Sequence, residues 1–170
     1  MGRGCLFAAV HLREAELSLA VKESRIGELI ALDQDEESLE VISRDYPECN
    51  IRTVHGSVRQ LISGKPKFLG CDLVYAAGLF DYLEQPFGKR LVENMFDMVK
   101  PGGKIMIANF THDIPDAGYM ESIMDWWLIY RSREQVAELF SNLSQECIGK
   151  LKVFCDPDQN IIFASAERLA

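Results

Sequence analysis

Acidic residues follow two apolar runs of this sequence, at or just beyond the point where each run ends. Asp33 closes the run Glu28–Asp33, and Asp81 comes shortly after the run Cys71–Ala77. A carboxylate at the end of a strand can accept hydrogen bonds from two neighbouring hydroxyl groups of a sugar ring. It can also act as a general base toward a hydroxyl or an amine. The structural alternatives are a charge that favours a helix start for Asp33 and a turn or cap residue for Asp81.

The histidines and cysteines do not form the clusters that a metal site requires. His11, His55 and His112 are isolated in the sequence, and no two cysteines have the C-x-x-C spacing. His112 follows the fifth apolar run, where it could act as a base, although a solvated loop histidine is the simpler interpretation. The five cysteines are scattered and odd in number, which predicts reduced thiols in a cytoplasmic protein.

Length, charge and hydropathy narrow the classes of function. The chain has 170 residues, which fits a single domain, and a formal net charge of −8. This charge argues against binding to nucleic acid or to an anionic membrane surface, because there is no basic footprint. The longest apolar runs are far shorter than the roughly 20 residues of a membrane span. We therefore expect no nucleic-acid partner and no membrane span.

Short apolar runs alternate with amphipathic stretches along most of the chain. Such alternation predicts right-handed βαβ units in a parallel, doubly wound sheet. The expected strands are Cys5–Val10, Glu28–Asp33, Asn50–Val54, Cys71–Ala77 and Lys104–Phe110. The expected helices are Leu12–Lys22, Glu36–Tyr46, a short helix capped by Ser57, and Phe87–Val99.

The C-terminal part departs from this alternation. Leu151–Cys155 and Ile161–Ala164 have the composition of strands, and only the segment Asp156–Asn160 connects them. A connection this short leaves no room for a parallel crossover. The two strands are therefore expected to pair as an antiparallel hairpin.

Four segments carry a resemblance to a known family. They are LDQD at Leu32–Asp35, AAGLFDYL at Ala76–Leu83, VKPGGKIMIANF at Val99–Phe110 and YMESIMDWWLIYR at Tyr119–Arg131. With them the chain resembles, over nearly its whole length, the class I S-adenosylmethionine-dependent methyltransferases. The resemblance implies an α/β fold with a doubly wound, Rossmann-like, mostly parallel seven-stranded sheet and a C-terminal antiparallel hairpin. It also implies S-adenosyl-L-methionine as the cofactor and methyl transfer to a small acceptor that is apolar or bears a carboxylate.

GLFDYL together with the last of these segments is similar to a narrower bacterial subgroup. That subgroup includes proteins of hydroxy-fatty-acid methyl ester biosynthesis. We expect residues 1–170 to form a single S-adenosylmethionine-binding, methyltransferase-like domain. Because the first expected strand begins so early, a missing N-terminal region that would cover the substrate is part of this expectation.

The resemblance assigns nine residues to cofactor binding along one edge of the sheet. Asp33 would accept hydrogen bonds from the ribose, and Glu14 would face the amino group of the methionine moiety. The other contacts would come from the first loop, the adenine side and the exit of the fourth strand: Val10, His11, Gln34, Ser57, Val58, Ala77 and Gly78. Ser57 is equally expected as a plain helix N-cap, and Glu14 as half of a surface pair with Arg13.

The first strand-to-helix turn departs from the family. Ala8–Glu14 contains no glycine, whereas the family carries a glycine-rich loop there. This leaves a second class of function open, namely a degenerate, non-catalytic domain that serves as a binding or regulatory module. A third class, a nicotinamide-dependent oxidoreductase, should show G-x-G-x-x-G after the first strand, and this motif is absent.

On the acceptor side, the resemblance places Asp81 and Tyr82 beside the methyl group as the catalytic residues. An acceptor carboxylate is already ionised near pH 7, and Asp81 would then only orient Tyr82 or a backbone amide. A hydroxyl or amine acceptor would make Asp81 a candidate base. The residues assigned to acceptor binding are Asn109, Tyr119, Trp126, Tyr130 and Arg131.

The apolar residues of Tyr119–Arg131 recur at helical spacing, which predicts one amphipathic helix. We expect this helix to cover an apolar acceptor pocket, with Arg131 available for an acceptor carboxylate. The alternative is a homodimer in which the same segment is buried against a second subunit.

Overall fold

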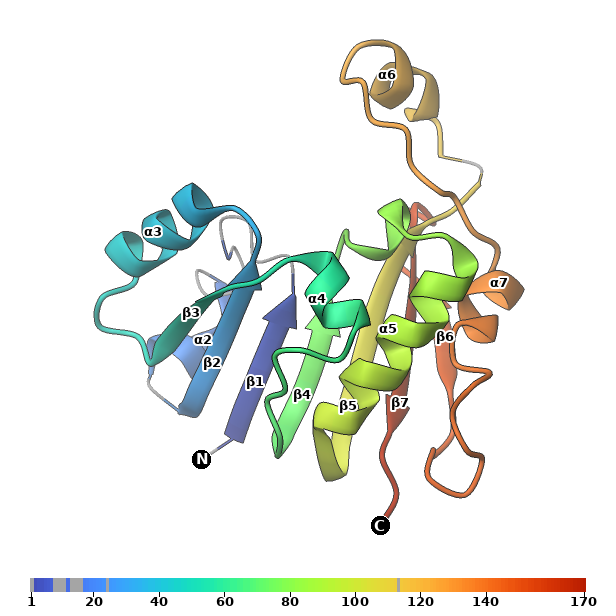
Figure 1. Cartoon of the computed structure of the whole chain (residues 1–170). Helices are drawn as coiled ribbons and strands as arrows, with labels where there is room; N and C mark the ends of the chain where they lie inside the picture. Colours follow the sequence, from blue (N-terminus) through green and yellow to red (C-terminus); the bar gives the residue numbers. More distant parts are fainter. Residues whose placement is uncertain (1, 8–11, 13–16, 24, 113) are drawn as a thin grey trace.

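The apolar runs form the strands of one seven-stranded sheet, in the order β3-β2-β1-β4-β5-β7-β6 (Figure 1). The computed structural model describes residues 2–7, 12, 17–23, 25–112 and 114–170. The strands are β1 Gly2–Phe7, β2 Ile26–Asp33, β3 Ile51–His55, β4 Cys71–Ala76, β5 Val99–Phe110, β6 Lys152–Cys155 and β7 Ile161–Glu167. β1 to β5 pair in parallel, and β7 runs antiparallel to both of its neighbours. The predicted Rossmann-like sheet with its antiparallel hairpin is confirmed.

Helices pack on both faces of this sheet. On one face lie α4 (Val58–Ile62), α5 (Gln85–Met98) and α7 (Arg133–Glu138), and their buried residues include Leu61, Leu91 and Val136. On the other face lie α2 (Leu19–Lys22) and α3 (Glu36–Asp45), which bury Val21, Leu39 and Ile42. Parallel strands covered on both faces are apolar along their whole length. None of the helices formed by the described residues is long and apolar enough to cross a membrane.

The first strand begins earlier than its apolar run predicts. β1 spans Gly2–Phe7, and residues 8–10 of the expected strand lie outside the described part. Gly2 pairs with Ile26 of β2, and Gly4 pairs with Leu73 of β4. Pairing with both neighbours therefore starts before the run does, because hydropathy reports burial and not the register of pairing.

The prediction of one helix over Tyr119–Arg131 is wrong. α6 spans only Ala117–Ser122, and the chain then continues without helix as far as residue 132. Asp125 has a left-handed backbone, with φ of 54°. Farther on, the Ile129 N–H donates a 2.7 Å hydrogen bond to the carbonyl oxygen of Asp81. A backbone N–H that bonds to another segment is lost to a helix, so tertiary contacts override the local spacing.

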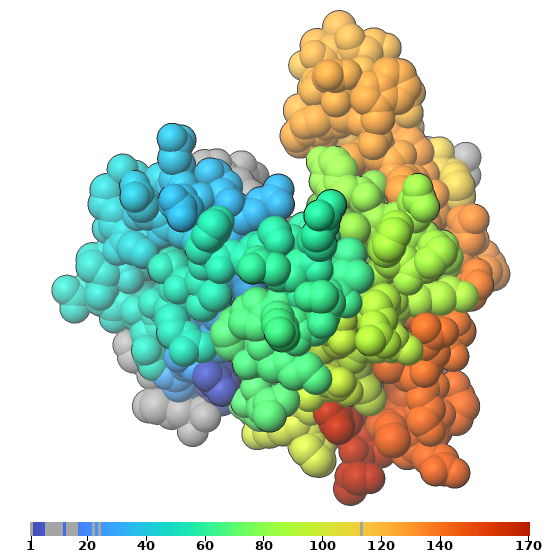
Figure 2. Space-filling model, in the orientation of Figure 1, coloured from blue at the N-terminus to red at the C-terminus, as the bar shows by residue number. Residues whose placement is uncertain are grey.

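We call residues 111–130 the arm. It contains α6 and extends beyond the carboxyl ends of the strands (Figure 1), and Figure 2 shows that its outer part stands clear of the body of the molecule. We call its outer part, residues 119–127, the tip. The tip exposes large apolar side chains instead of burying them. These are Tyr119, Ile123, Met124, Trp126 and Trp127.

Candidate active site

The carboxyl ends of β1 to β5 lie at one edge of the sheet (Figure 1). β1 and β4 are neighbours there, although β2 and β3 come between them in the sequence. Open α/β sheets bind ligands in the crevice beside such a switch point. The residues that the sequence analysis assigned to ligand binding in β2, β4 and β5 follow or end these strands, so the fold brings them to the same edge.

Asp33, the last residue of β2, is only 6% exposed. Its Oδ1 accepts a 3.0 Å hydrogen bond from the Asp35 N–H. Its Oδ2 is buried and has no hydrogen-bond partner in the part of the chain that the structure describes. Leaving a buried acceptor unpaired costs roughly 1–3 kcal/mol, so a ligand hydroxyl that reached this oxygen would bind favourably. The helix-start role belongs instead to Asp35, whose side chain caps α3.

The residues expected near adenine lie on the neighbouring turns. Gln34 is exposed, and its carbonyl oxygen lies 3.1 Å from Nε2 of His55. The Ser57 hydroxyl accepts a hydrogen bond from the Gln60 N–H at 3.3 Å, while the Gln60 side chain accepts one from the Ser57 N–H at 2.8 Å. The N-cap interpretation of Ser57 is therefore confirmed. Adenine contacts of Gln34, Ser57 and the half-buried Val58 stay predictions.

The exit of β4 presents exposed backbone at the switch point. Ala77 and Gly78 are both exposed and lead into the short 3-10 helix η2 (Phe80–Tyr82). Gly78 has φ of 85°, a conformation that residues with a side chain avoid. A ligand can therefore approach the main chain closely here. The first-loop residues Val10, His11 and Glu14 lie outside the described residues.

Arg131 lies inside the protein and is 2% exposed. Its guanidinium group donates hydrogen bonds to the carbonyl oxygens of Phe80 and Leu83, to the side-chain oxygen of Asn109 and, at 2.9 Å, to Oε1 of Gln85. The expectation that Arg131 is available to an acceptor carboxylate does not agree with this geometry, because four of its five N–H donors are used inside the fold.

Asn109 is buried beside Arg131 at the end of β5. Its amide nitrogen donates to the carbonyl oxygens of Phe110 at 3.0 Å and Ile129 at 2.8 Å, and its oxygen accepts from Arg131. These bonds join β5 to the end of the arm. The structure thus shows Asn109 bonded to protein groups instead of directed at an acceptor.

Asp81 completes this set of buried polar side chains and is 2% exposed. Its Oδ1 accepts a 2.8 Å hydrogen bond from the Phe110 N–H. Burial raises the pKa of Asp81 from 3.8 to about 6, although the Phe110 N–H and the charge of Arg131 favour the ionised form. We call Asp81, Asn109 and Arg131 the root network, because they fasten the arm to the sheet.

The two tyrosines of the predicted site differ in where they place their hydroxyl groups. Tyr82 is 58% exposed. The Tyr130 hydroxyl is buried and has no hydrogen-bond partner of ordinary geometry among the described residues. Burial, together with the nearby carboxylates of Glu121 and Asp81, raises the pKa of Tyr130. Tyr130 therefore brings a hydroxyl group close to Asp81 and Glu121.

Two polar residues of this region escaped the sequence analysis. Glu121 lies near the Tyr130 hydroxyl, and Gln85 bonds to Arg131 and, at 2.8 Å, to the carbonyl oxygen of Gln135. Their contacts depend on where the chain after α6 returns to the sheet. No local pattern in the sequence encodes that return, so no signal could have found them.

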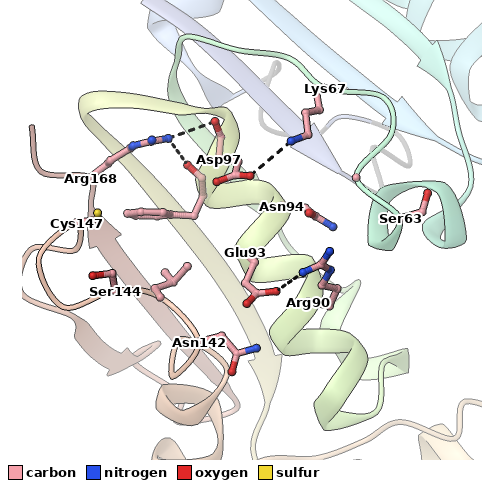
Figure 3. Close-up of a pocket in the computed structure, with 13 residues that line it drawn as sticks. Ser63, Lys67, Arg90, Glu93, Asn94, Asp97, Asn142, Ser144, Cys147 and Arg168 are labelled. Atoms are coloured by element: carbon pink, nitrogen blue, oxygen red, sulfur yellow. Dashed lines mark hydrogen bonds and ion pairs between the residues drawn. The ribbon is translucent and has the colours of Figure 1, made fainter.

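A polar pocket of about 440 Å³ lies elsewhere, at the end of α5 (Figure 3). Its charged side chains are paired, Arg90 with Glu93 at 3.0 Å and Lys67 with Asp97 at 3.5 Å. Arg168 donates to main-chain carbonyl oxygens beside it. These groups satisfy one another, and the pocket is not a candidate site. Within the described residues, no group of three or more His, Cys, Asp or Glu side chains could hold a metal ion.

No protein-family model and no curated protein matches this chain. Solved structures do. A possible exported protein from Bordetella parapertussis is 17% identical with a TM-score of 0.76, covering 99% of this chain and 62% of its own. N-methyltransferase NodS from Bradyrhizobium japonicum, in complex with S-adenosyl-L-homocysteine, is 16% identical with a TM-score of 0.66. The match covers 98% of this chain and 78% of the NodS chain.

A third similar structure is the CurJ carbon methyltransferase, 12% identical with a TM-score of 0.76, covering 99% of this chain and 48% of its own. The chain thus spans between about half and about four fifths of the lengths of these three proteins. At such identities the likeness establishes the fold, a Rossmann-like sheet that this chain shares with several S-adenosylmethionine-dependent methyltransferases.

Proposed function

We propose that this chain binds S-adenosylmethionine across the carboxyl edge between β1 and β4 and transfers its methyl group to a small-molecule acceptor. The observation that carries the proposal is the buried Oδ2 of Asp33, which has no hydrogen-bond partner among the described residues. A ribose hydroxyl is a donor of the right kind for this oxygen, which can accept more than one hydrogen bond. The exposed turn at Ala77–Gly78 leaves the adjacent strand end open to the rest of the nucleotide.

When bound, S-adenosylmethionine would supply an electrophilic methyl group. The protein then has to hold the acceptor in line, about 3–3.5 Å from that carbon, in a site that excludes water. The arm, with Tyr119 and Trp126 on it, extends from the same edge and would cover the acceptor. Asp81 is mostly ionised near pH 7 and lies close to Tyr130, so this pair can take up a proton from an acceptor that carries one.

Calorimetry with S-adenosylhomocysteine tests the proposal without needing the acceptor. The variant Asp33→Asn keeps an oxygen for the Asp35 N–H but replaces the free carboxylate oxygen with an amide donor. We expect its affinity to fall by about tenfold to a hundredfold, because hydrogen bonds to a charged group are lost. Asp158→Asn makes the same chemical change at an exposed position in the β6–β7 turn and should bind like the parent protein.

Two results would contradict the proposal. One is equal affinity of Asp33→Asn and the parent protein, since the carboxylate would then make no contact. The other is the absence of binding at millimolar ligand, which would favour the non-catalytic module that the glycine-free first loop leaves open.

A further inference from the structure

The arm is acidic as well as aromatic. Residues 111–130 include four Asp or Glu residues and no Lys or Arg. Two of these acids, Glu121 and Asp125, lie among the exposed apolar side chains of the tip. Acid and ring are in direct contact at one point, where Nε1 of Trp127 donates a 2.8 Å hydrogen bond to Oδ1 of Asp125. Negative charge therefore accompanies aromatic surface along this part of the molecule.

The cation nearest in sequence to the arm does not offset this charge at the surface. Arg131 is buried and donates its hydrogen bonds to Phe80, Leu83, Gln85 and Asn109. The carboxylates of Glu121 and Asp81 lie near the Tyr130 hydroxyl, which has no partner of ordinary geometry among the described residues. A ligand beneath the arm would meet hydrogen-bond acceptors and negative charge.

We propose that the methyl acceptor of this site is a small apolar amine, bound as its ammonium ion by the acids and aromatic rings of the arm. This inference rests on the proposed function and names the substrate class for it. An ammonium ion is attracted both to carboxylates and to the faces of Trp and Tyr rings. A carboxylate would meet like charge on the arm, which has no Lys or Arg of its own, so the acceptor implied by the hydroxy-fatty-acid resemblance does not fit this surface.

Methyl transfer to such an acceptor requires that one proton leave its nitrogen. The ammonium nitrogen gives one proton to a carboxylate of the site, and its freed electron pair forms the bond to the methyl carbon. The carbon–sulfur bond breaks, and its electron pair remains on sulfur. The same charge pattern opposes the alternative of a homodimer through the tip, because such an interface would gather the acids of both arms in one contact area.

The chain offers a built-in probe of the arm. Its only two tryptophans are Trp126 and Trp127. We would titrate the protein, saturated with S-adenosylhomocysteine, with three ligands that share a phenylethyl body: 2-phenylethylamine, 2-phenylethanol and 3-phenylpropionate. Tryptophan fluorescence reports occupancy of the arm and calorimetry gives the affinity. We expect the amine to bind at least about tenfold more tightly than the carboxylate, with the alcohol between them.

A double variant tests the charges themselves. Glu121→Gln with Asp125→Asn keeps side-chain size, and asparagine tolerates the left-handed backbone at position 125. We expect the amine to lose its advantage over the alcohol in this variant. The matched control, Glu146→Gln with Asp158→Asn, removes two exposed charges outside the arm and should keep the preference.

Each other outcome overturns the inference in a recognisable way. Equal affinities, or tightest binding of 3-phenylpropionate, would mean that the arm does not select an amine. A fluorescence spectrum that changes with protein concentration but with none of the ligands would mean that a second copy covers the tip. If S-adenosylhomocysteine binds and no phenylethyl ligand does, the acceptor assignment fails while the proposed function survives. If S-adenosylhomocysteine does not bind, both fail together.

Discussion

The tip and the root of the arm invert the usual distribution of side chains. At the tip, Ile123 and Trp127 are about 70% exposed, although both are large and apolar. At the root, Asp81, Asn109 and Arg131 are almost fully buried, although all three are polar or charged. An ordinary surface segment would be polar outside and anchored by apolar contacts inside.

The arm is therefore held in place by one set of residues, at the root, and exposes another set to solvent, at the tip. The root is held by directional hydrogen bonds from Arg131 and Asn109 to main-chain carbonyl oxygens, which fix one geometry. The tip contributes little buried area and is available to a ligand. Changes at the root should therefore alter the stability of the fold, and changes at the tip should alter binding.

The largest effect is expected from Arg131→Met, which removes the centre of the root network. The carbonyl oxygens of Phe80 and Leu83 and the oxygen of Asn109 would be left buried without their donor, and Asp81 would lose a favourable charge. We expect the free energy of unfolding, measured by urea denaturation, to fall by about 3–5 kcal/mol.

Arg133→Met is the control for this change. Arg133 is exposed, two residues farther along the chain, and its loss should change stability by no more than about 0.5 kcal/mol. If Arg131→Met lowers the free energy of unfolding no more than this control does, the root does not anchor the arm. The contrast between root and tip then disappears.

A smaller effect is expected from the ionisation of Asp81. Its pKa in the folded protein is about 6, above the ordinary 3.8, so the folded state holds this proton more tightly than the unfolded chain does. The contribution to stability is therefore fully present below about pH 4 and is lost as the pH rises through 6. The loss amounts to at most about 3 kcal/mol.

Asp81→Asn isolates this contribution, because asparagine keeps an oxygen for the Phe110 N–H and does not titrate. Urea unfolding between about pH 4 and pH 7.5 should show the parent protein losing stability relative to this variant as the pH rises. Parallel stability curves for the two proteins would show that the buried carboxylate is not the titrating group.

The fold was accessible from the sequence, and the root of the arm was not. Apolar runs predict β4 and β5, because the burial of a strand is visible in its own residues. The short connection between β6 and β7 predicts their hairpin, because it leaves no room for a crossover. The strand-end position of Asp33 follows from the same pattern.

The segment after α6 shows where prediction from the local sequence fails. The apolar residues from Met120 to Leu128 do have helical spacing, yet most of them are exposed, and the next main-chain N–H, that of Ile129, bonds to Asp81. The burial of Arg131 depends on carbonyl oxygens about 50 residues away in the sequence, which no window of residues contains.

The smallest effect on stability is expected at the tip. Trp127→Ala removes a side chain that is 69% exposed, so the free energy of unfolding should stay within about 0.5 kcal/mol of the parent value. The affinity for 2-phenylethylamine should nevertheless fall several-fold, because an aromatic face for the ammonium ion is lost, and Trp126 remains to report it. Leu69→Ala, a similarly exposed apolar position outside the arm, should change neither quantity. A loss of stability above about 1 kcal/mol in Trp127→Ala would mean that the tip is packed in solution, and the tip would then be an anchor like the root.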